Sequence, residues 1–138
     1  MANRYFQSVV KVLKSLDKFS GFVQSCRVIS ATKGTVEIEF DVTNEHVNSS
    51  EHLHEGCIAS LIDMVTSVAI SAYKTNVSID LFISYPNCAK LGDTVIVTGK
   101  VCYSNNKLAY TRAEVRRKKD NLLIAYGQHT KVFPKNPN

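Results

Sequence analysis

The sequence predicts an α+β fold in which a meander-like antiparallel sheet packs on one central helix. Three observations predict it. An amphipathic segment lies near the N-terminus, a long apolar segment occupies residues 56–73, and alternating apolar and polar residues lie on both sides of that segment. The expected order is helix, two strands, long helix and four strands. With 138 residues, the chain suits a single domain covering residues 1–138.

A helix and two strands are expected before the central helix. Apolar residues at helical spacing predict a helix over residues 5–19, ending near Gly21: Phe6, Val9, Val10, Leu13 and Leu16. Residues 22–31 read as a strand. After a turn at Gly34, residues 35–42 alternate cleanly between apolar and polar, which predicts a strand with one solvent-facing side.

Four strands are expected after the central helix, at residues 77–85, 93–104, 108–117 and 122–133. Turn residues separate them: Pro86-Asn87, Asn105-Asn106 and Asp120-Asn121. Residues 1–4 and 134–138 are expected to be loose.

The central helix carries a single formal charge, Asp63, between Gly56 and Tyr73. The helix is apolar or small on every side, so we expect it to be buried on every side. A buried carboxylate is costly unless it has partners, which makes Asp63 a candidate for function. A buried Asp satisfied by hydroxyls or the backbone, or an Asp that reaches water at the helix edge, is an equally good interpretation. This interior Asp and four Ser/Thr residues argue against a membrane span.

The start of this helix offers free amides, at Glu55, Gly56 and Cys57, that suit a polarised carbonyl or an oxyanion. At 1.5 Å per residue, Asp63 lies roughly 10–12 Å further along the axis. One substrate carbonyl cannot contact both points of the same chain. If both act together, a second protomer must supply one of them, and the site lies at a two-fold interface.

Charge and composition narrow the possible partners without choosing one. The net charge of +5 favours anionic partners, such as a phosphorylated small molecule, a nucleic acid or an acidic membrane surface. Lys11 and Lys14 interrupt the N-terminal apolar run, so no signal peptide is expected. The four cysteines lack metal or disulfide spacing and read as buried free thiols in a reducing compartment. The expected location is the cytoplasm. The mitochondrion is the alternative, because the first residues are basic.

Several motifs together resemble hotdog-fold acyl-CoA thioesterases, from about residue 5 to the end of the chain. They are NSSEHLHEG at 48–56, ASLID at 59–63, VSIDL at 77–81, AKLGD at 89–93, LAYT at 108–111 and GQHTK at 127–131. The resemblance implies a hotdog fold, a long central helix wrapped by a curved antiparallel sheet. It implies a homodimer with a continuous sheet, usually assembled as a homotetramer. It also implies hydrolysis of fatty acyl-CoA, with CoA as part of the substrate and no separate cofactor.

The resemblance also implies roles for individual residues. Asp63 would be the general base, and Ser78 would help to orient the water. Asn48 and the amide of Glu55 would polarise the thioester carbonyl on the facing subunit, with His54 shaping that end. The implied CoA-binding positions are Ser78, Tyr85, Pro86, Asn87, Lys90, Tyr103, Lys107 and Leu108. The lysines suit phosphate groups.

One position departs from the family pattern. The family reads His-Gly-Gly where this chain reads His54-Glu55-Gly56. A backbone amide survives any side chain, but a carboxylate close to developing negative charge is unfavourable. A non-catalytic acyl-CoA-binding protein, with hydrolysis weakened by Glu55, is therefore the alternative.

Other chemistries fit less well. His52 and His54 with neighbouring acids could bind zinc, but the spacing of a structural site is missing, and no metal is expected. No G-x-S-x-G motif marks a nucleophilic serine. The basic run at 116–119 could contact CoA or a nucleic acid, yet it lacks interleaved aromatic residues, so no nucleic acid partner is expected. His46 and His129 read as surface or sheet residues.

Overall fold

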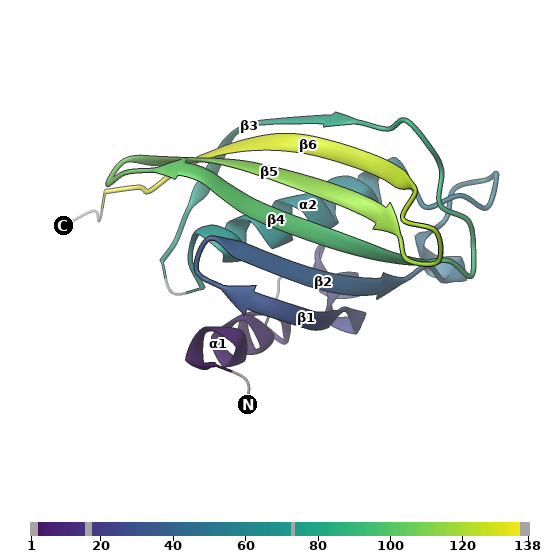
Figure 1. Cartoon of the computed structure of the whole chain (residues 1–138), viewed down its shortest axis with the longest axis horizontal. Helices are drawn as coiled ribbons and strands as arrows, with labels where there is room; N and C mark the ends of the chain where they lie inside the picture. The colour runs from purple at the N-terminus through teal and green to yellow at the C-terminus, as the bar shows by residue number, and fades with distance from the viewer. Residues whose placement is uncertain (1–2, 16–17, 73, 136–138) are drawn as a thin grey trace.

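The computed structural model describes residues 3–15, 18–72 and 74–135, and it confirms the α+β order. Within these residues, Figure 1 shows a curved antiparallel sheet with one long helix behind it. The helices are α1 (Arg4–Leu13) and α2 (Glu55–Ile70), with two 3-10 helices, η1 (Gly21–Ser25) and η2 (Asn44–His46). The strands are β1 (Arg27–Thr32), β2 (Thr35–Asp41), β3 (Val77–Ser84), β4 (Thr94–Ser104), β5 (Leu108–Arg117) and β6 (Leu123–Val132). Their order in the sheet is β1-β2-β4-β5-β6-β3.

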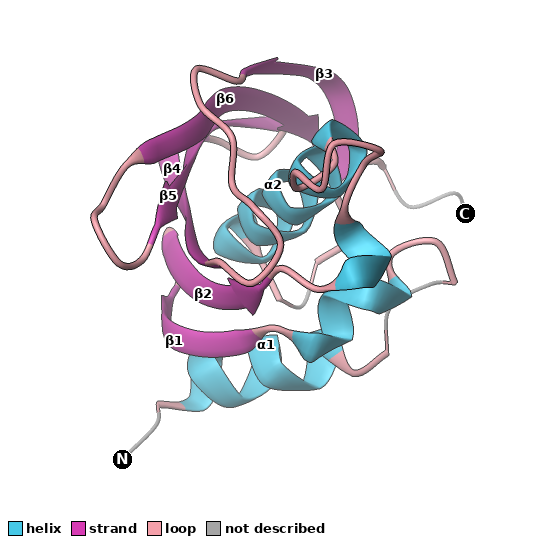
Figure 2. Ribbon diagram, turned by 90° about the vertical axis from the view of Figure 1, so that its right-hand side faces the viewer, coloured by secondary structure: helices cyan, strands magenta, loops and turns pink. Residues whose placement is uncertain are grey.

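The sheet curves around α2, as the end-on view in Figure 2 shows. Alternate residues of β2, β4 and β5 are buried and form the core with the helix: Val36, Ile38, Phe40, Val95, Val97, Ala113 and Val115. At Gly99 the strand and helix backbones approach closely, because a Cβ there would lie 2.9 Å from the Val65 carbonyl oxygen. This contact sets the height of α2 above the sheet and therefore the position of Asp63.

The first helix is shorter than predicted, since α1 ends at Leu13 rather than at residue 19. The Ser15 hydroxyl donates to the main-chain carbonyls of Lys11 and Val12, and such local bonds compete with helical ones. Residues 16 and 17 lie outside the described residues, and residues 18–20 form a bend and a turn.

The start of α1 is attached to β1, the edge strand of the sheet, by a hydrogen bond. The Asn3 side chain accepts a hydrogen bond from the Phe6 amide and donates one to the Ala31 carbonyl of β1. Residues 3 and 4, which we expected to be loose, are therefore ordered. The rest of the expected loose ends, residues 1, 2 and 136–138, lies outside the described residues.

The first strand is also shorter than predicted. The stretch 22–31 was expected to be extended, but residues 21–25 form η1 and β1 begins at Arg27. The Ser25 hydroxyl donates to the Phe22 carbonyl, and the Val23 side chain turns into the core, which favours a turn over a strand. The other strands agree with the prediction within one residue at each end.

The opposite edge of the sheet is β3, and its apolar residues are exposed. Ile79 is 59% and Phe82 69% exposed. A bulge between Ser78 and Asp80 interrupts the alternation that the sequence predicts. Whereas α1 covers β1, no described element pairs with the outer side of β3.

The thiols differ from the expectation that they are buried. Cys26 and Cys57 are partly buried, whereas Cys88 and Cys102 are exposed, and all are free. Burial raises the pKa of the Cys26 thiol to about 12, so this sulfur stays protonated and unreactive.

Candidate active site

Asp63 lies in the middle of α2, on a flank that the sheet leaves partly open. The expectation that the helix is buried on every side is wrong here, because 49% of the Asp63 side chain is exposed. Its Oδ1 atom is nevertheless buried and has no hydrogen-bond partner among the described residues. One carboxylate oxygen therefore faces the protein interior, while the rest of the group opens outward.

His129 of β6 lies against this buried oxygen. Its side chain is 0% exposed, and its Nε2 atom lies 3.7 Å from Asp63 Oδ1. The same nitrogen lies 2.7 Å from the Ser78 hydroxyl, and Nδ1 lies 2.7 Å from the Thr66 hydroxyl. The structure thus places the two sequence-predicted residues, Asp63 and Ser78, at the same nitrogen of a histidine that we had interpreted only as a surface or sheet residue.

The hydrogen bonds of Thr66 define the tautomer of His129. The Thr66 hydroxyl has one proton, which it donates to the Ile62 carbonyl at 2.8 Å. It must therefore accept from Nδ1–H of His129, which leaves Nε2 as the acceptor for the Ser78 hydroxyl. Burial lowers the pKa of His129, and the nearby Lys131 ammonium lowers it further, so the ring is neutral near pH 7.

This arrangement differs from a Ser-His-Asp triad. In a triad the carboxylate binds the imidazole nitrogen opposite the serine. Here Asp63 and Ser78 approach the same nitrogen, Nε2, and the hydroxyl of Thr66 occupies the other side. Asp63 therefore does not orient His129 for attack by Ser78, and its carboxylate stays available to another group.

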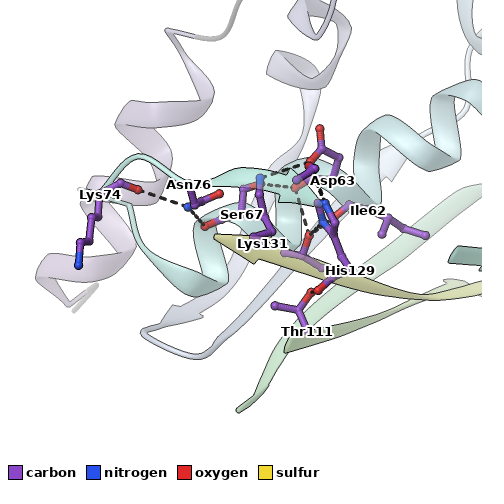
Figure 3. Close-up of polar contacts among 10 residues, drawn as sticks. Ile62, Asp63, Ser67, Lys74, Asn76, Thr111, His129 and Lys131 are labelled. Carbon is purple, nitrogen blue, oxygen red and sulfur yellow. Dashed lines mark hydrogen bonds and ion pairs between the residues drawn. The ribbon is translucent and has the colours of Figure 1, made fainter. Parts of the chain in front are cut away.

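Lys131 completes the cluster, as Figure 3 shows. Only 6% of its side chain is exposed, and its Nζ atom donates to the Ser67 hydroxyl at 2.6 Å. Nζ lies 3.6 Å from Asp63 Oδ1, which makes an ion pair but not a hydrogen bond. Burial lowers the pKa of Lys131, while Asp63 raises it.

The sequence held a signal for both residues that our interpretation did not use. In a strand, residues 129 and 131 lie on the same face. The burial pattern of β6 shows that this face is the buried one, on the side of the sheet that faces α2 and Asp63. Ionisable residues at alternate inward positions were therefore the pattern to look for.

The start of α2 is organised by His54. Its Nδ1 atom accepts a hydrogen bond from the Gly56 amide at 2.8 Å, so His54 is the N-cap residue. Among the described residues, the Glu55 amide has no hydrogen-bond acceptor. A Cβ at Gly56 would lie 3.1 Å from His54 Nδ1, so a larger residue would require the His54 ring to shift. The free donor is thus the main-chain amide of Glu55, next to the His54 ring, which is held by the Gly56 amide.

Asn48 is oriented by the loop that precedes α2. Its Oδ1 atom accepts hydrogen bonds from the amides of Ser50 and His52, at 2.9 and 3.1 Å. These bonds turn the chain at Glu51, which has a φ of 60°. Among the described residues the Nδ2 group of Asn48 has no acceptor, so it can donate to another molecule.

The predicted catalytic residues fall into two groups within one chain. Asp63 and Ser78 lie together at the middle of α2, whereas His54 and Glu55 lie at its start, with Asn48 on the preceding loop. Eight helical positions separate Glu55 from Asp63, which is about 12 Å. The single chain therefore does not bring the two groups together.

The predicted CoA-binding positions are divided in the same way. Tyr85 lies near the start of α2, where its hydroxyl is 3.4 Å from the Glu55 carbonyl. The main chain of Lys90 forms an isolated antiparallel β-bridge with that of His52. Pro86 and Asn87 are exposed on the same connection. The hairpin with Tyr103, Lys107 and Leu108 joins β4 to β5 at the opposite end of the sheet (Figure 1).

The basic run at 116–119, which covers the end of β5 and the turn after it, is neutralised by acidic neighbours. Arg116 pairs with Glu114, Arg117 with Asp120 and Asp93, Lys118 with Glu39, and Lys119 with Asp93. Such pairing is typical of a solvated charged turn and leaves little free charge for CoA or a nucleic acid.

Two kinds of feature are absent from the described part of the chain. No group of three or more His, Cys, Asp or Glu side chains is placed to hold a metal ion. In the same residues, every helix is too short or too polar to cross a membrane.

Comparisons with known proteins identify the family and the fold of this chain. The family model of the thioesterase superfamily matches residues 50–124. Human acyl-coenzyme A thioesterase 13 is 34% identical over 131 residues, covering 91% of this chain and 94% of the relative. The crystal structure of mouse thioesterase superfamily member 2 has a TM-score of 0.89 at 28% identity, covering 97% of this chain and 100% of that one. The zebrafish thioesterase superfamily member 2 has a TM-score of 0.87 at 29% identity, covering 97% and 99%. This chain therefore belongs to the thioesterase superfamily, a family of thioester hydrolases, and has its hotdog fold.

Proposed function

We propose that this chain hydrolyses acyl-CoA thioesters to a free acid and CoA, with Asp63 activating the attacking water. The observation that carries the proposal is the state of the Asp63 carboxylate. One oxygen is buried between His129 and Lys131, and the rest of the side chain is open. A carboxylate held in this way, with a free face, is suited to accept a proton from a bound water.

We propose that a second protomer completes the site. The β3 edge supports this, because it carries exposed apolar residues and an unpaired backbone, a surface that favours pairing with another strand. A two-fold axis at this edge would let the Glu55 amide of one protomer approach Asp63 of the other. Each dimer would then hold two equivalent sites.

The reaction would proceed by attack of water on the thioester carbonyl carbon. Asp63 accepts a proton from the water as the new C–O bond forms. The Glu55 amide and Asn48 Nδ2 donate to the carbonyl oxygen, which becomes negative. The C–S bond then breaks, and the leaving CoA thiolate takes the proton from Asp63, which regenerates the carboxylate. Ser78, whose own proton is held by His129, can accept a hydrogen bond from the water and orient it.

The Glu55 side chain is compatible with this role of its amide. Glu55 is exposed, and it lies in the first turn of α2 with no positive φ. Its amide can therefore point outward from the helix end while the carboxylate extends into solvent. The pKa of Tyr85 is raised by burial and by the charge of Glu55, which places that charge near Tyr85.

The two groups of CoA-binding positions would also come from different protomers. Tyr85, Pro86, Asn87 and Lys90 would line one side, and Tyr103, Lys107 and Leu108 of the partner the other. Ser78 lies between them, next to Asp63. Lys90 and Lys107 make no ion pair with the described residues, so both are available for phosphate groups.

Some parts of the proposal are supported by the resemblance alone. The substrate we propose is a fatty acyl-CoA, by analogy with the name of the human relative. The assembly we propose is a homotetramer made of two dimers. The compartment we propose is the cytoplasm, with the mitochondrion as the alternative.

One observation favours a second mechanism for the same reaction. Nε2 of His129 accepts from the Ser78 hydroxyl at 2.7 Å, which is the contact that a serine nucleophile needs. However, the imidazolium formed by that route would face the neutral Thr66 hydroxyl at Nδ1 instead of a carboxylate. Direct attack by water on the thioester is therefore favoured.

Release of the CoA thiol tests the proposal. With medium- and long-chain acyl-CoA, Asp63→Asn should reduce kcat by at least about a hundredfold, as expected for loss of a general base. The matched control is Glu114→Gln on the outer face of the sheet, which should keep the activity. An Asp63→Asn enzyme with undiminished kcat would exclude Asp63 as the base.

Two further variants separate the alternatives. If Glu55 has silenced hydrolysis, the wild type will bind acyl-CoA without releasing thiol, and Glu55→Gly will restore release. If Ser78 is the nucleophile, an acyl-enzyme will be trapped by mass spectrometry on Ser78 and lost in Ser78→Ala.

A further inference from the structure

Lys131 contacts none of the reacting atoms in the hydrolysis proposed above, yet it is buried beside the carboxylate that acts as the base. A buried ammonium is costly to keep charged, so a lysine at such a position is normally neutralised or paired. Here the pair is Asp63, whose buried Oδ1 lies 3.6 Å from Lys131 Nζ. The same oxygen has no hydrogen-bond donor among the described residues. The Lys131 ammonium is thus the nearest cation to a carboxylate oxygen that has no hydrogen-bond donor among the described residues.

Ser67 fixes the position of the ammonium. Its hydroxyl donates to the Asp63 carbonyl at 2.6 Å and accepts from Lys131 Nζ at 2.6 Å. Because the hydroxyl proton is used by the carbonyl, a lone pair of Ser67 must face Lys131. One ammonium proton is therefore held by α2 itself, and the other two remain free to approach Oδ1. A neutral side chain of the same length would supply no charge at this point.

We propose that Lys131 is a positioning residue for thioester hydrolysis: its buried ammonium, held by Ser67, fixes the Asp63 carboxylate in place while substrate covers the site. This inference rests on the proposed function. When a partner and a substrate cover the open face of Asp63, water is displaced and charge interactions become stronger. The nearby cation then matters more than it does in the open chain.

Few other charges surround this pair. His129 faces Asp63 from β6 at 3.7 Å, and Asp80 of β3 acts on His129. The buried positions of β2, β4 and β5 that face α2 carry no ionisable side chain. Burial lowers the pKa of both Lys131 and His129, with His129 the weaker base. Lys131 is therefore the cation that faces the buried oxygen near neutral pH.

The test compares wild type, Lys131→Met, Lys131→Arg and Ser67→Ala in the thiol-release assay across pH. Lys131→Met should lower kcat by at least about tenfold with KM nearly unchanged, since it removes a charge that acts on the base. On the alkaline side, wild-type kcat/KM should fall at a pH below the ordinary lysine value of 10.5, after subtraction of hydroxide hydrolysis. Lys131→Arg keeps a charge that does not titrate, so it should retain activity and lose this alkaline fall.

A purely structural role of Lys131 would not change the pH at which kcat/KM falls on the alkaline side. The pH profile therefore distinguishes a positioning role from a structural one. Wild-type kcat and an unshifted alkaline limb in Lys131→Met would overturn the inference, even if Asp63→Asn is inactive as proposed. Ser67→Ala keeps both charges but releases the ammonium, so a several-fold lower kcat is expected. This variant provides the test if either Lys131 variant fails to fold.

A readout without turnover keeps the inference testable if no thioester is hydrolysed. The Lys131 Cε resonance, followed by NMR against pH, reports the titration of the ammonium. Because Asp63 raises the pKa of Lys131, Asp63→Asn should lower that pKa further. An identical titration in wild type and Asp63→Asn would show that the two groups are not coupled and would overturn the inference. A failure of the proposed function appears instead as absent thiol release with this coupling intact.

Discussion

The buried hydroxyl of Thr66 offers a direct test of how His129 is held. Thr66→Val keeps the shape of the side chain but removes the oxygen that accepts from His129 Nδ1–H at 2.7 Å. An unsatisfied buried donor costs about 1–3 kcal/mol of unfolding free energy. For 138 residues the unfolding entropy is about 0.3 kcal/mol/K, so Tm should fall by about 3–10 °C.

The same change should alter the tautomer of the ring. Without Thr66, the proton is better placed on Nε2, where it can bond to Ser78. The Ser78 hydroxyl would then accept a hydrogen bond from the His129 ring, so one of its lone pairs would no longer be available to the water. We therefore expect kcat to fall as well, and the ¹⁵N shifts of the His129 ring to show the exchange of the two nitrogens.

Thr66→Ser is the matched control. It keeps the hydroxyl and loses one methyl group, so about 1 kcal/mol of stability should be lost while kcat and the tautomer are retained. The reasoning is refuted if Thr66→Val matches wild type in Tm and kcat, or if Thr66→Ser loses as much activity as Thr66→Val. Thermal and urea denaturation at matched protein concentration, with the thiol-release assay, provide all of these values.

Two further predictions concern packing and pH. Gly99→Ala places a Cβ 2.9 Å from the Val65 carbonyl oxygen, about 0.5 Å inside ordinary contact, and should lower the unfolding free energy measured in urea by about 1–3 kcal/mol. Gly21→Ala, with nothing within 4 Å of its Cβ, should match wild type. Equal stabilities for the two variants would contradict the close approach at Gly99. Burial lowers the pKa of both His46 and His129, so the unfolded chain binds more protons as pH falls below the ordinary value of 6.5. Stability should therefore be complete above pH 6.5 and decline below it, and a flat urea midpoint from pH 7.5 to 5 would refute this.

Most of the fold could be predicted from the sequence because the patterns were local. Alternation over residues 35–42 and 108–117 identified β2 and β5, and the apolar run identified α2. The errors lie where side-chain hydroxyls compete with the main chain, at Ser15 and Ser25. Such competition depends on where the next element packs, which a local pattern does not contain.

The candidate site could be predicted only in part, for a similar reason. Asp63 was identified because a lone charge in an apolar helix conflicts with its surroundings. His129 and Lys131 were missed because they are about 65 positions away and meet Asp63 only through the register of β6. The exposed flank of α2 was missed because helical periodicity does not show which side a sheet leaves open.

The division of donors at the start of α2 limits which substitutions this enzyme can tolerate. The Gly56 amide is bound by the ring of His54, whereas the amide of the neighbouring residue is free. Residue 55 should therefore vary in chemistry, since the proposed site uses only its main chain, and a carboxylate there is compatible with the same backbone. Residue 56 has less freedom, because a Cβ there would lie 3.1 Å from His54 Nδ1 and the imidazole would have to shift. Mutational tolerance should thus change abruptly between these adjacent positions.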